Sequence, residues 1–150
     1  MDQTLTFAIP EGFRAMSDEE LNGLDHYGEK PEWCIFDPER HIMLSCARRK
    51  SGFAARLLKA KEVAKNMEVQ IKRAMKSYGY ELKGFLTEEM GGETADGFVY
   101  TYTAQDTAMV GESISLKRAN IFYYFHAYWR AEGPDAKPVL REIFSSFKWE

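Results

Sequence analysis

The feature that most constrains this sequence is the stretch from Asn120 to Arg130, NIFYYFHAYWR, in which six of the eleven side chains are aromatic rings. Such a composition is typical of a β-strand, whose successive side chains point to opposite faces of a sheet. One face would carry Ile121, Tyr123, Phe125, Ala127 and Trp129, and the other Phe122, Tyr124, His126, Tyr128 and Arg130. Both faces are strongly apolar, so we expect a central strand in a sheet that is covered on both sides.

Two segments have the pattern of helices that can provide this cover. Residues 57–78 carry apolar side chains at steps of three and four, as the buried stripe of a helix does. These positions are Leu57, Ala60, Ala64, Met67, Ile71, Ala74 and Tyr78. Near the end of the chain, Pro138 suits the first turn of a second helix. The apolar stripe of that helix consists of Leu140, Ile143, Phe144 and Phe147.

The other segments predict one short helix and several antiparallel strands. Ser17 and Glu20 have the spacing of a capping box, which predicts a helix over 18–24. A first strand is predicted over 4–9, and the runs EWCIFD and HIMLSCARR predict a hairpin. Alternating segments then predict a four-stranded meander over 80–89, 97–105, 109–118 and 120–130.

These elements together predict a single domain over residues 1–150, because neither a linker nor a repeat divides the chain. The fold class is α+β, a three-layer α/β/α sandwich with a central, mainly antiparallel sheet. A long helix follows the first hairpin, and a second helix lies near the C-terminus. A length of 150 residues, with 45% hydrophobic and 29% charged residues, is typical of one soluble globular domain.

The two cysteines, Cys34 and Cys46, lie on the two arms of the predicted hairpin. Antiparallel pairing makes them diagonal neighbours at best, so we expect free, buried thiols. The sequence has no C-x-x-C motif, no phosphate-binding glycine loop and no G-x-S-x-G motif. We therefore predict no metal, no cofactor and no catalytic residue.

The charge of the chain is unevenly distributed, although the net charge is only −3. Residues 48–76 hold ten basic against two acidic side chains. Part of this excess forms a basic face on the long helix, composed of Lys61, Lys65, Lys72, Arg73 and Lys76. The basic segment 48–76 is more typical of a solvated helix surface, or of a site for an acidic partner, than of a nucleic-acid site. The reason is that aromatic side chains are not interleaved with the basic ones.

The polar fringe of the aromatic strand is the first candidate site. Neighbouring strands of the meander would bring further polar side chains to this fringe, which we assign to Tyr100, Tyr102, Glu112, His126, Tyr128 and Arg130. A cross-strand pair of Glu112 with Arg130 would be structural. A pair of His126 with Glu112 would supply a proton shuttle that works near neutral pH.

The N-terminal sequence MDQTLTFAIP has neither the basic start nor the apolar core of a secretion signal. The longest uncharged apolar run is also much shorter than the roughly 20 residues that a membrane-spanning helix needs. We therefore expect a cytoplasmic protein without a membrane span.

Several segments resemble the PsbP-like superfamily. They are the opening FAIPEGFRAMSDEEL, the strand ADGFVYTYTAQ, the aromatic strand and the ending FSSFKWE, so that the resemblance covers nearly the whole chain. This α/β/α sandwich is shared by an extrinsic subunit of photosystem II, the Mog-type Ran-release factor of yeast and many bacterial proteins. The resemblance implies that fold and a bacterial branch of the superfamily, together with non-catalytic binding of other proteins.

These observations favour a non-catalytic binding or adaptor domain. We expect its partner to be another protein, with an acidic partner or a second copy of the chain as options. The alternative is a small-molecule binder or an enzyme that uses His126 and Glu112 in a pocket on the face of the sheet.

Overall fold

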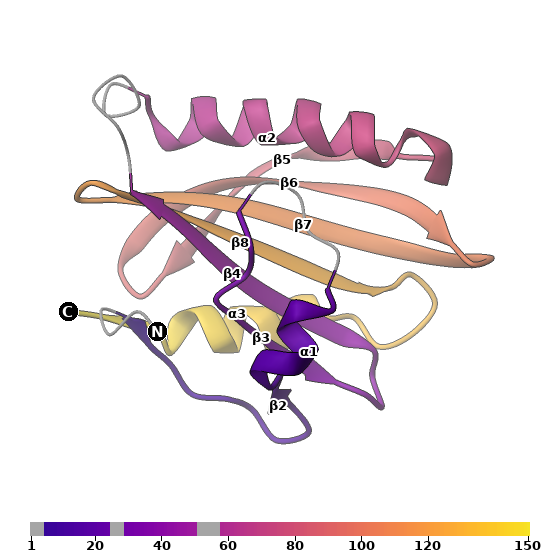
Figure 1. The fold of residues 1–150 in the computed structure, drawn as a ribbon, viewed down its shortest axis with the longest axis horizontal. Coiled ribbons are helices and arrows are strands. Elements are labelled where there is room, and N and C mark those ends of the chain that lie inside the picture. Colours follow the sequence, from indigo (N-terminus) through magenta and orange to yellow (C-terminus); the bar gives the residue numbers. More distant parts are fainter. Residues whose placement is uncertain (1–4, 25–28, 51–57) are drawn as a thin grey trace.

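A seven-stranded antiparallel sheet forms the middle layer of the computed structural model, which describes residues 5–24, 29–50 and 58–150 (Figure 1). The strand order is β2-β3-β4-β8-β7-β6-β5. In this order the strands are β2 (Arg14–Ala15), β3 (Trp33–Asp37), β4 (Ile42–Lys50), β8 (Ile121–Arg130), β7 (Thr107–Arg118), β6 (Glu93–Ala104) and β5 (Glu81–Met90). The aromatic strand β8 is the central one, as its two apolar faces predicted.

The predicted meander is confirmed, with tighter turns than expected. The turn after β5 consists of Gly91 and Gly92 alone, so β6 begins at Glu93 instead of near residue 97. Gln105 and Asp106 join β6 to β7 with φ angles of 50° and 63°, the left-handed conformation of a two-residue hairpin turn. These short turns fix the register between the strands.

The lower layer, on the face of the sheet opposite the long helix, holds the larger core. It contains helix α3 (Lys137–Ser145), whose buried residues are Leu140, Ile143 and Phe144. Two short strands, β1 (Leu5–Thr6) and β9 (Lys148–Trp149), pair with each other beside this helix. The first strand therefore differs from the prediction over 4–9, because its described part is two residues long and pairs outside the main sheet.

The upper layer is helix α2 (Ala60–Ala74), followed by the 3-10 turn η2 (Lys76–Tyr78). In Figure 1 it lies across the sheet on the side opposite α3. The predicted stripe is confirmed at Ala64, Met67 and Ile71, which are buried. Ala74 and Tyr78 are exposed instead, because the helix ends at Ala74, and Met75 takes the buried position. Leu57 lies outside the described residues.

The N-terminal segment packs beside β3. The predicted capping box is present at helix α1 (Asp18–Asn22), since Ser17 accepts a hydrogen bond from the backbone of Glu20 and the Glu20 carboxylate accepts one from Ser17. The hairpin is formed by β3 and β4, with Cys34 opposite Ser45. Cys34 and Cys46 are buried thiols, as expected. None of the described helices is both long enough and apolar enough to cross a membrane.

Both faces of β8 have a cover, as expected from its sequence. On the lower face, Tyr123, Phe125 and Trp129 belong to the main core together with residues of α3. On the upper face, Tyr124 and Tyr128 pack against a smaller cluster built on α2. The three-layer α+β sandwich is therefore confirmed, although the cover on the upper face is incomplete.

Candidate functional site: a trough beside helix α2

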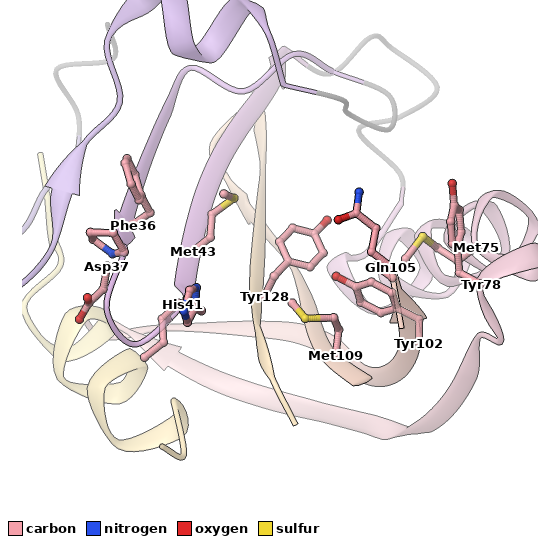
Figure 2. A pocket seen from close by; sticks show the side chains of 13 residues that line it. Phe36, Asp37, His41, Met43, Met75, Tyr78, Tyr102, Gln105, Met109 and Tyr128 are labelled. Carbon is pink, nitrogen blue, oxygen red and sulfur yellow. The ribbon is translucent and has the colours of Figure 1, made fainter. Parts of the chain in front are cut away.

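Helix α2 covers only part of the upper face of the sheet. It packs on β6 and β7, whereas β3 and β4 extend beyond it. A helix is about 10 Å wide and strands are about 4.8 Å apart, so one helix spans roughly two of the seven strands. A pocket of about 800 Å³ lies in the uncovered region, between the end of α2 and the β3–β4 hairpin (Figure 2). We call this pocket the trough.

The trough is lined mainly by apolar and aromatic side chains. Its lining residues are Phe36, Asp37, Pro38, His41, Ile42, Met43, Met75, Tyr78, Tyr102, Ala104, Gln105, Met109 and Tyr128. Figure 2 shows Tyr128, Met109 and Tyr102 near its middle, between the hairpin and the end of α2. Methionine side chains adapt their shape to a ligand more readily than branched ones do. The volume lies within the roughly 300–1,000 Å³ that is typical of ligand sites.

Asp37 organises the hairpin end of the trough. Its carboxylate accepts hydrogen bonds from the backbone of Glu39 and Arg40, at 2.9 and 3.1 Å, and forms an ion pair with the Arg40 side chain. Burial alone would raise the pKa of Asp37, but these hydrogen bonds outweigh it and hold that pKa below its usual value. Arg40 also donates to the backbone carbonyl of Glu11 at 3.2 Å, which ties the turn to the N-terminal segment.

A smaller side pocket, of about 180 Å³, lies between β8 and the middle of α2. Its polar lining includes Asn66 and Gln70 of α2 together with His126 of β8. The ring nitrogen Nδ1 of His126 lies 2.8 Å from the hydroxyl of Ser113 on β7. Burial lowers the pKa of His126 to about 4, so the imidazole is neutral at pH 7.

The structure separates the residues of the predicted site. Tyr102 and Tyr128 line the trough, and His126 lines the side pocket. Tyr100 is fully buried below α2, where a Cβ atom added at Gly111 would lie 2.4 Å from its ring. Arg130 is exposed at the end of β8, opposite Met109 of β7.

The predicted pairs of Glu112 are both wrong. Glu112 is opposite Ala127 and points to the lower face, whereas His126 and Arg130 belong to the upper face. Its carboxylate forms an ion pair with Lys137, at the start of α3. Burial raises the pKa of Glu112 to about 7, although the hydrogen bond from Lys137 opposes this shift. The carboxyl group of Glu112 and the imidazole of His126 therefore lie on opposite faces of the sheet.

The sequence already contained the signal that excludes a pair of His126 with Glu112. The two-residue turn Ala119–Asn120 pairs Arg118 with Ile121, and each further step along the hairpin keeps the sum of the two residue numbers constant. Ser113 is then the partner of His126. Since Glu112 is one step away, it must point to the opposite face.

Several residues of the trough were not predicted as site residues. Only the fold brings these residues together, namely Phe36 of β3, Met43 of β4, Met75 between α2 and η2, Tyr78 of η2 and Met109 of β7. Their apolar side chains gave no signal that distinguishes a binding surface from a core. The clue lay in the width of the sheet, since one helix cannot cover the upper face of seven strands.

The predicted basic face lies on the outer surface of α2 and η2. All of its members are exposed, namely Lys61, Lys65, Lys72, Arg73 and Lys76. Within the described residues, no three side chains of His, Cys, Asp or Glu lie close enough together to hold a metal ion. Burial raises the pKa of the Cys34 thiol to about 12, so this side chain stays protonated at neutral pH.

Comparison with known proteins supports the fold. No protein-family model and no curated protein sequence gives a significant match. Among solved structures, cyanobacterial PsbP (CyanoP) from Synechocystis sp. PCC 6803 is similar with a TM-score of 0.67 and 13% identity, over 100% of this chain and 95% of that one. LpqN of Mycobacterium tuberculosis, described as involved in cell envelope biogenesis, has a TM-score of 0.60 and 12% identity, over 98% and 85% of the two chains. The protein therefore has a PsbP-like fold.

Proposed function

We propose that this protein is a non-catalytic binding domain that takes up an apolar segment of a protein partner in the trough. The observation that carries this proposal is the uncovered strip of the upper face, where Met43, Met109 and Tyr128 lie side by side at the surface of a pocket of about 800 Å³. Buried aromatic and methionine side chains are enriched at the centres of protein interfaces. The resemblance to the PsbP-like superfamily, which includes the Ran-release factor, supports a protein partner.

The chemistry of the described side chains supports binding rather than catalysis. His126 is held neutral, and its hydrogen-bond partner is the hydroxyl of Ser113 instead of a carboxylate. Glu112, the acid that was expected beside it, faces the other side of the sheet. The trough itself offers Asp37, whose carboxylate is engaged with Arg40, and His41 of the same hairpin turn. Most of the other lining side chains are apolar or aromatic, which suits binding of an apolar segment.

A second candidate is a small apolar ligand in the same trough. The volume of the trough favours it, since most sites for small molecules have a similar size. In this alternative the trough remains the binding site, but its ligand is a small molecule instead of a protein segment.

The test compares partners that are captured from the native cell by the wild-type protein and by Met109→Glu. A carboxylate in the middle of the trough should prevent an apolar segment from binding, because burial of an unpaired charge is costly. We expect at least about a tenfold loss of captured partner, which corresponds to roughly 1.4 kcal/mol. Quantitative mass spectrometry of the captured proteins provides the measurement.

The matched control is Ile9→Glu, which adds the same charge at a side chain that is 47% exposed and lies outside the trough. It should capture the same proteins as the wild type. If Met109→Glu captures them equally well, the proposal is wrong. Native mass spectrometry covers the second candidate, since a small ligand would appear as added mass on the wild-type protein and be absent from Met109→Glu.

A further inference from the structure

The free edge of the sheet at β5 forms a surface that is separate from the trough. Among the described strands, β5 pairs only with β6, so one row of its backbone N–H and C=O groups has no strand partner in the described sheet. Edge strands of this kind can accept an additional strand from another chain. At the other edge, β2 has only two residues and offers much less backbone for pairing.

Two large apolar side chains are exposed along this edge. Phe85 is 50% exposed and Leu82 is 37% exposed. Their partners on β6 are Phe98 and Tyr100, both of which belong to the cluster below α2. Phe85 and Leu82 therefore extend this cluster outward on the upper face, where a strand added beside β5 would cover them.

A row of lysine side chains lies on the side of α2 that faces the same edge. Lys61, Lys65 and Lys72 share one stripe of α2 with Glu68, because they are separated by three, four or seven residues along the helix. Glu68 accepts a hydrogen bond at 2.6 Å from the hydroxyl of Tyr80, the residue that precedes β5. This contact shows that the stripe is on the β5 side of the helix, which itself packs on β6 and β7.

On this edge, the acidic side chains of β5 have hydrogen-bond or ion-pair partners, whereas the lysines of α2 form no ion pair among the described residues. The acidic side chains of β5 have local partners, since Glu81 pairs with Lys83, Glu88 with Lys137, and Glu89 with the hydroxyl of Thr94. The three lysines of the α2 stripe form none of the ion pairs found among the described residues. The α2 stripe itself therefore carries an excess of positive charge, three lysines against Glu68.

We propose that the β5 edge binds an extended, acidic segment of a protein partner, which adds as a strand beside β5. Its backbone would pair with β5 along residues 85–89, where the register with β6 is regular. This stretch of β5 ends before Met90, whose backbone carbonyl already accepts a hydrogen bond from Trp149. The irregularity between Leu82 and Gly84 limits pairing at the other end of the strand. On the upper face, apolar side chains of the segment would cover Phe85, and its carboxylates would meet the lysine row.

Fluorescence anisotropy with labelled peptides tests this proposal. The probe is the ten-residue peptide TVTETVTETV, in which valine and glutamate alternate along one face of a strand. We expect it to bind at least about tenfold more tightly than the same peptide with lysine in place of glutamate, and less tightly as salt increases. A third peptide, with its four central amides N-methylated, should bind at least about tenfold more weakly because it cannot pair with β5.

Variants of the protein locate the surface. The triple variant Lys61→Gln, Lys65→Gln and Lys72→Gln should weaken binding of the glutamate peptide about tenfold. The matched control, Lys50→Gln, Arg141→Gln and Lys148→Gln, removes the same charge from exposed residues elsewhere and should bind like the wild type. Amide shifts of the labelled protein should change along β5.

Three results would overturn the proposal. They are equal binding of the acidic and basic peptides, equal binding of the N-methylated peptide, and amide shifts confined to the trough. Absence of measurable binding by the glutamate peptide would overturn it as well. None of these results affects the proposal for the trough, because Met109→Glu changes a different surface.

Discussion

At the scale of single residues, Glu112 has the most unusual surroundings. Its carboxyl group is completely buried and has Lys137 and Glu88 as its charged neighbours. Burial and the proximity of Glu88 favour the neutral acid, whereas Lys137 favours the carboxylate. The balance raises the pKa of Glu112 to about 7, which places its titration in the physiological range.

This raised pKa predicts that stability decreases with increasing pH. An unfolded glutamate has a pKa of about 4.3, so between that value and about 7 the folded protein binds the extra proton. The contribution of Glu112 to stability is thus complete below about pH 4.3 and is lost as the pH rises through 7. Between pH 5 and pH 8 the free energy of unfolding, measured by urea denaturation, should decrease in the wild type. The decrease should be smaller in Glu112→Gln by about 1–3 kcal/mol.

The control for this measurement is Glu89→Gln, which changes an exposed carboxylate on β5. It should have the same dependence on pH as the wild type. If Glu112→Gln also keeps the wild-type dependence, then Glu112 titrates normally and the buried cluster has been assigned incorrectly.

The face of the sheet on which a side chain lies was predicted correctly where it depends on the alternation within a single strand. The alternation in the aromatic strand correctly divided Tyr123 and Phe125 from Tyr124 and Tyr128. The prediction failed for Glu112 and His126, because their relation depends on the parity of two strands joined by a turn. The faces of one strand follow from the sequence directly, whereas contacts between strands require the register.

At the scale of elements, local chemistry was the most reliable guide. The capping box of Ser17 and Glu20 correctly placed the start of α1, since both hydrogen bonds lie within four residues of the chain. The strand β2 was not predicted, because its two residues pair with β3 only after the chain folds. The end of α2 was also misplaced, since Met75 continues the stripe but leaves the helical conformation.

Removal of this cap should destabilise the protein measurably. In Ser17→Ala the backbone N–H of Glu20 loses its acceptor at 3.2 Å, so the free energy of unfolding should fall by about 1 kcal/mol. Chemical denaturation measures this change. Ser145→Ala is the control, because it changes an exposed serine at the last position of α3 and should alter stability by less than about 0.5 kcal/mol. Equal effects of the two variants would contradict this role of the cap.

At the scale of the whole molecule, the two cores differ greatly in size. In the part of the chain that the structure describes, the lower core contains twenty buried hydrophobic residues, whereas the cluster below α2 contains five. Burial of apolar surface is the main source of stability, so the upper layer is held more weakly. Because the upper layer is small, the trough is left open. The difference between the two layers could not be predicted from periodicity, because periodicity identifies an apolar face of a strand or helix but not how much of that face another element covers.

Hydrogen exchange under native conditions should detect this difference between the layers. Amides in α2 should exchange through a local opening with a lower free energy than those of α3 and the centre of β8. The variant Met67→Ala, which removes a buried side chain of α2, should lower the opening energy of α2 further. Equal protection of both helices in the wild type would show that the layers open together.

The pairing of β1 with β9 gives the molecule a natural side for attachment to a surface. Leu5 pairs with Trp149, and both lie on the α3 side of the sheet, where they contact the lower core. Figure 1 shows the labelled C-terminal end on the α3 side of the sheet, away from α2. A biosensor chip or a fluorescent label coupled at the C-terminal end would therefore leave the trough turned toward the solution. It would lie near the end of β5, because Trp149 donates a hydrogen bond to the backbone carbonyl of Met90 at 2.7 Å.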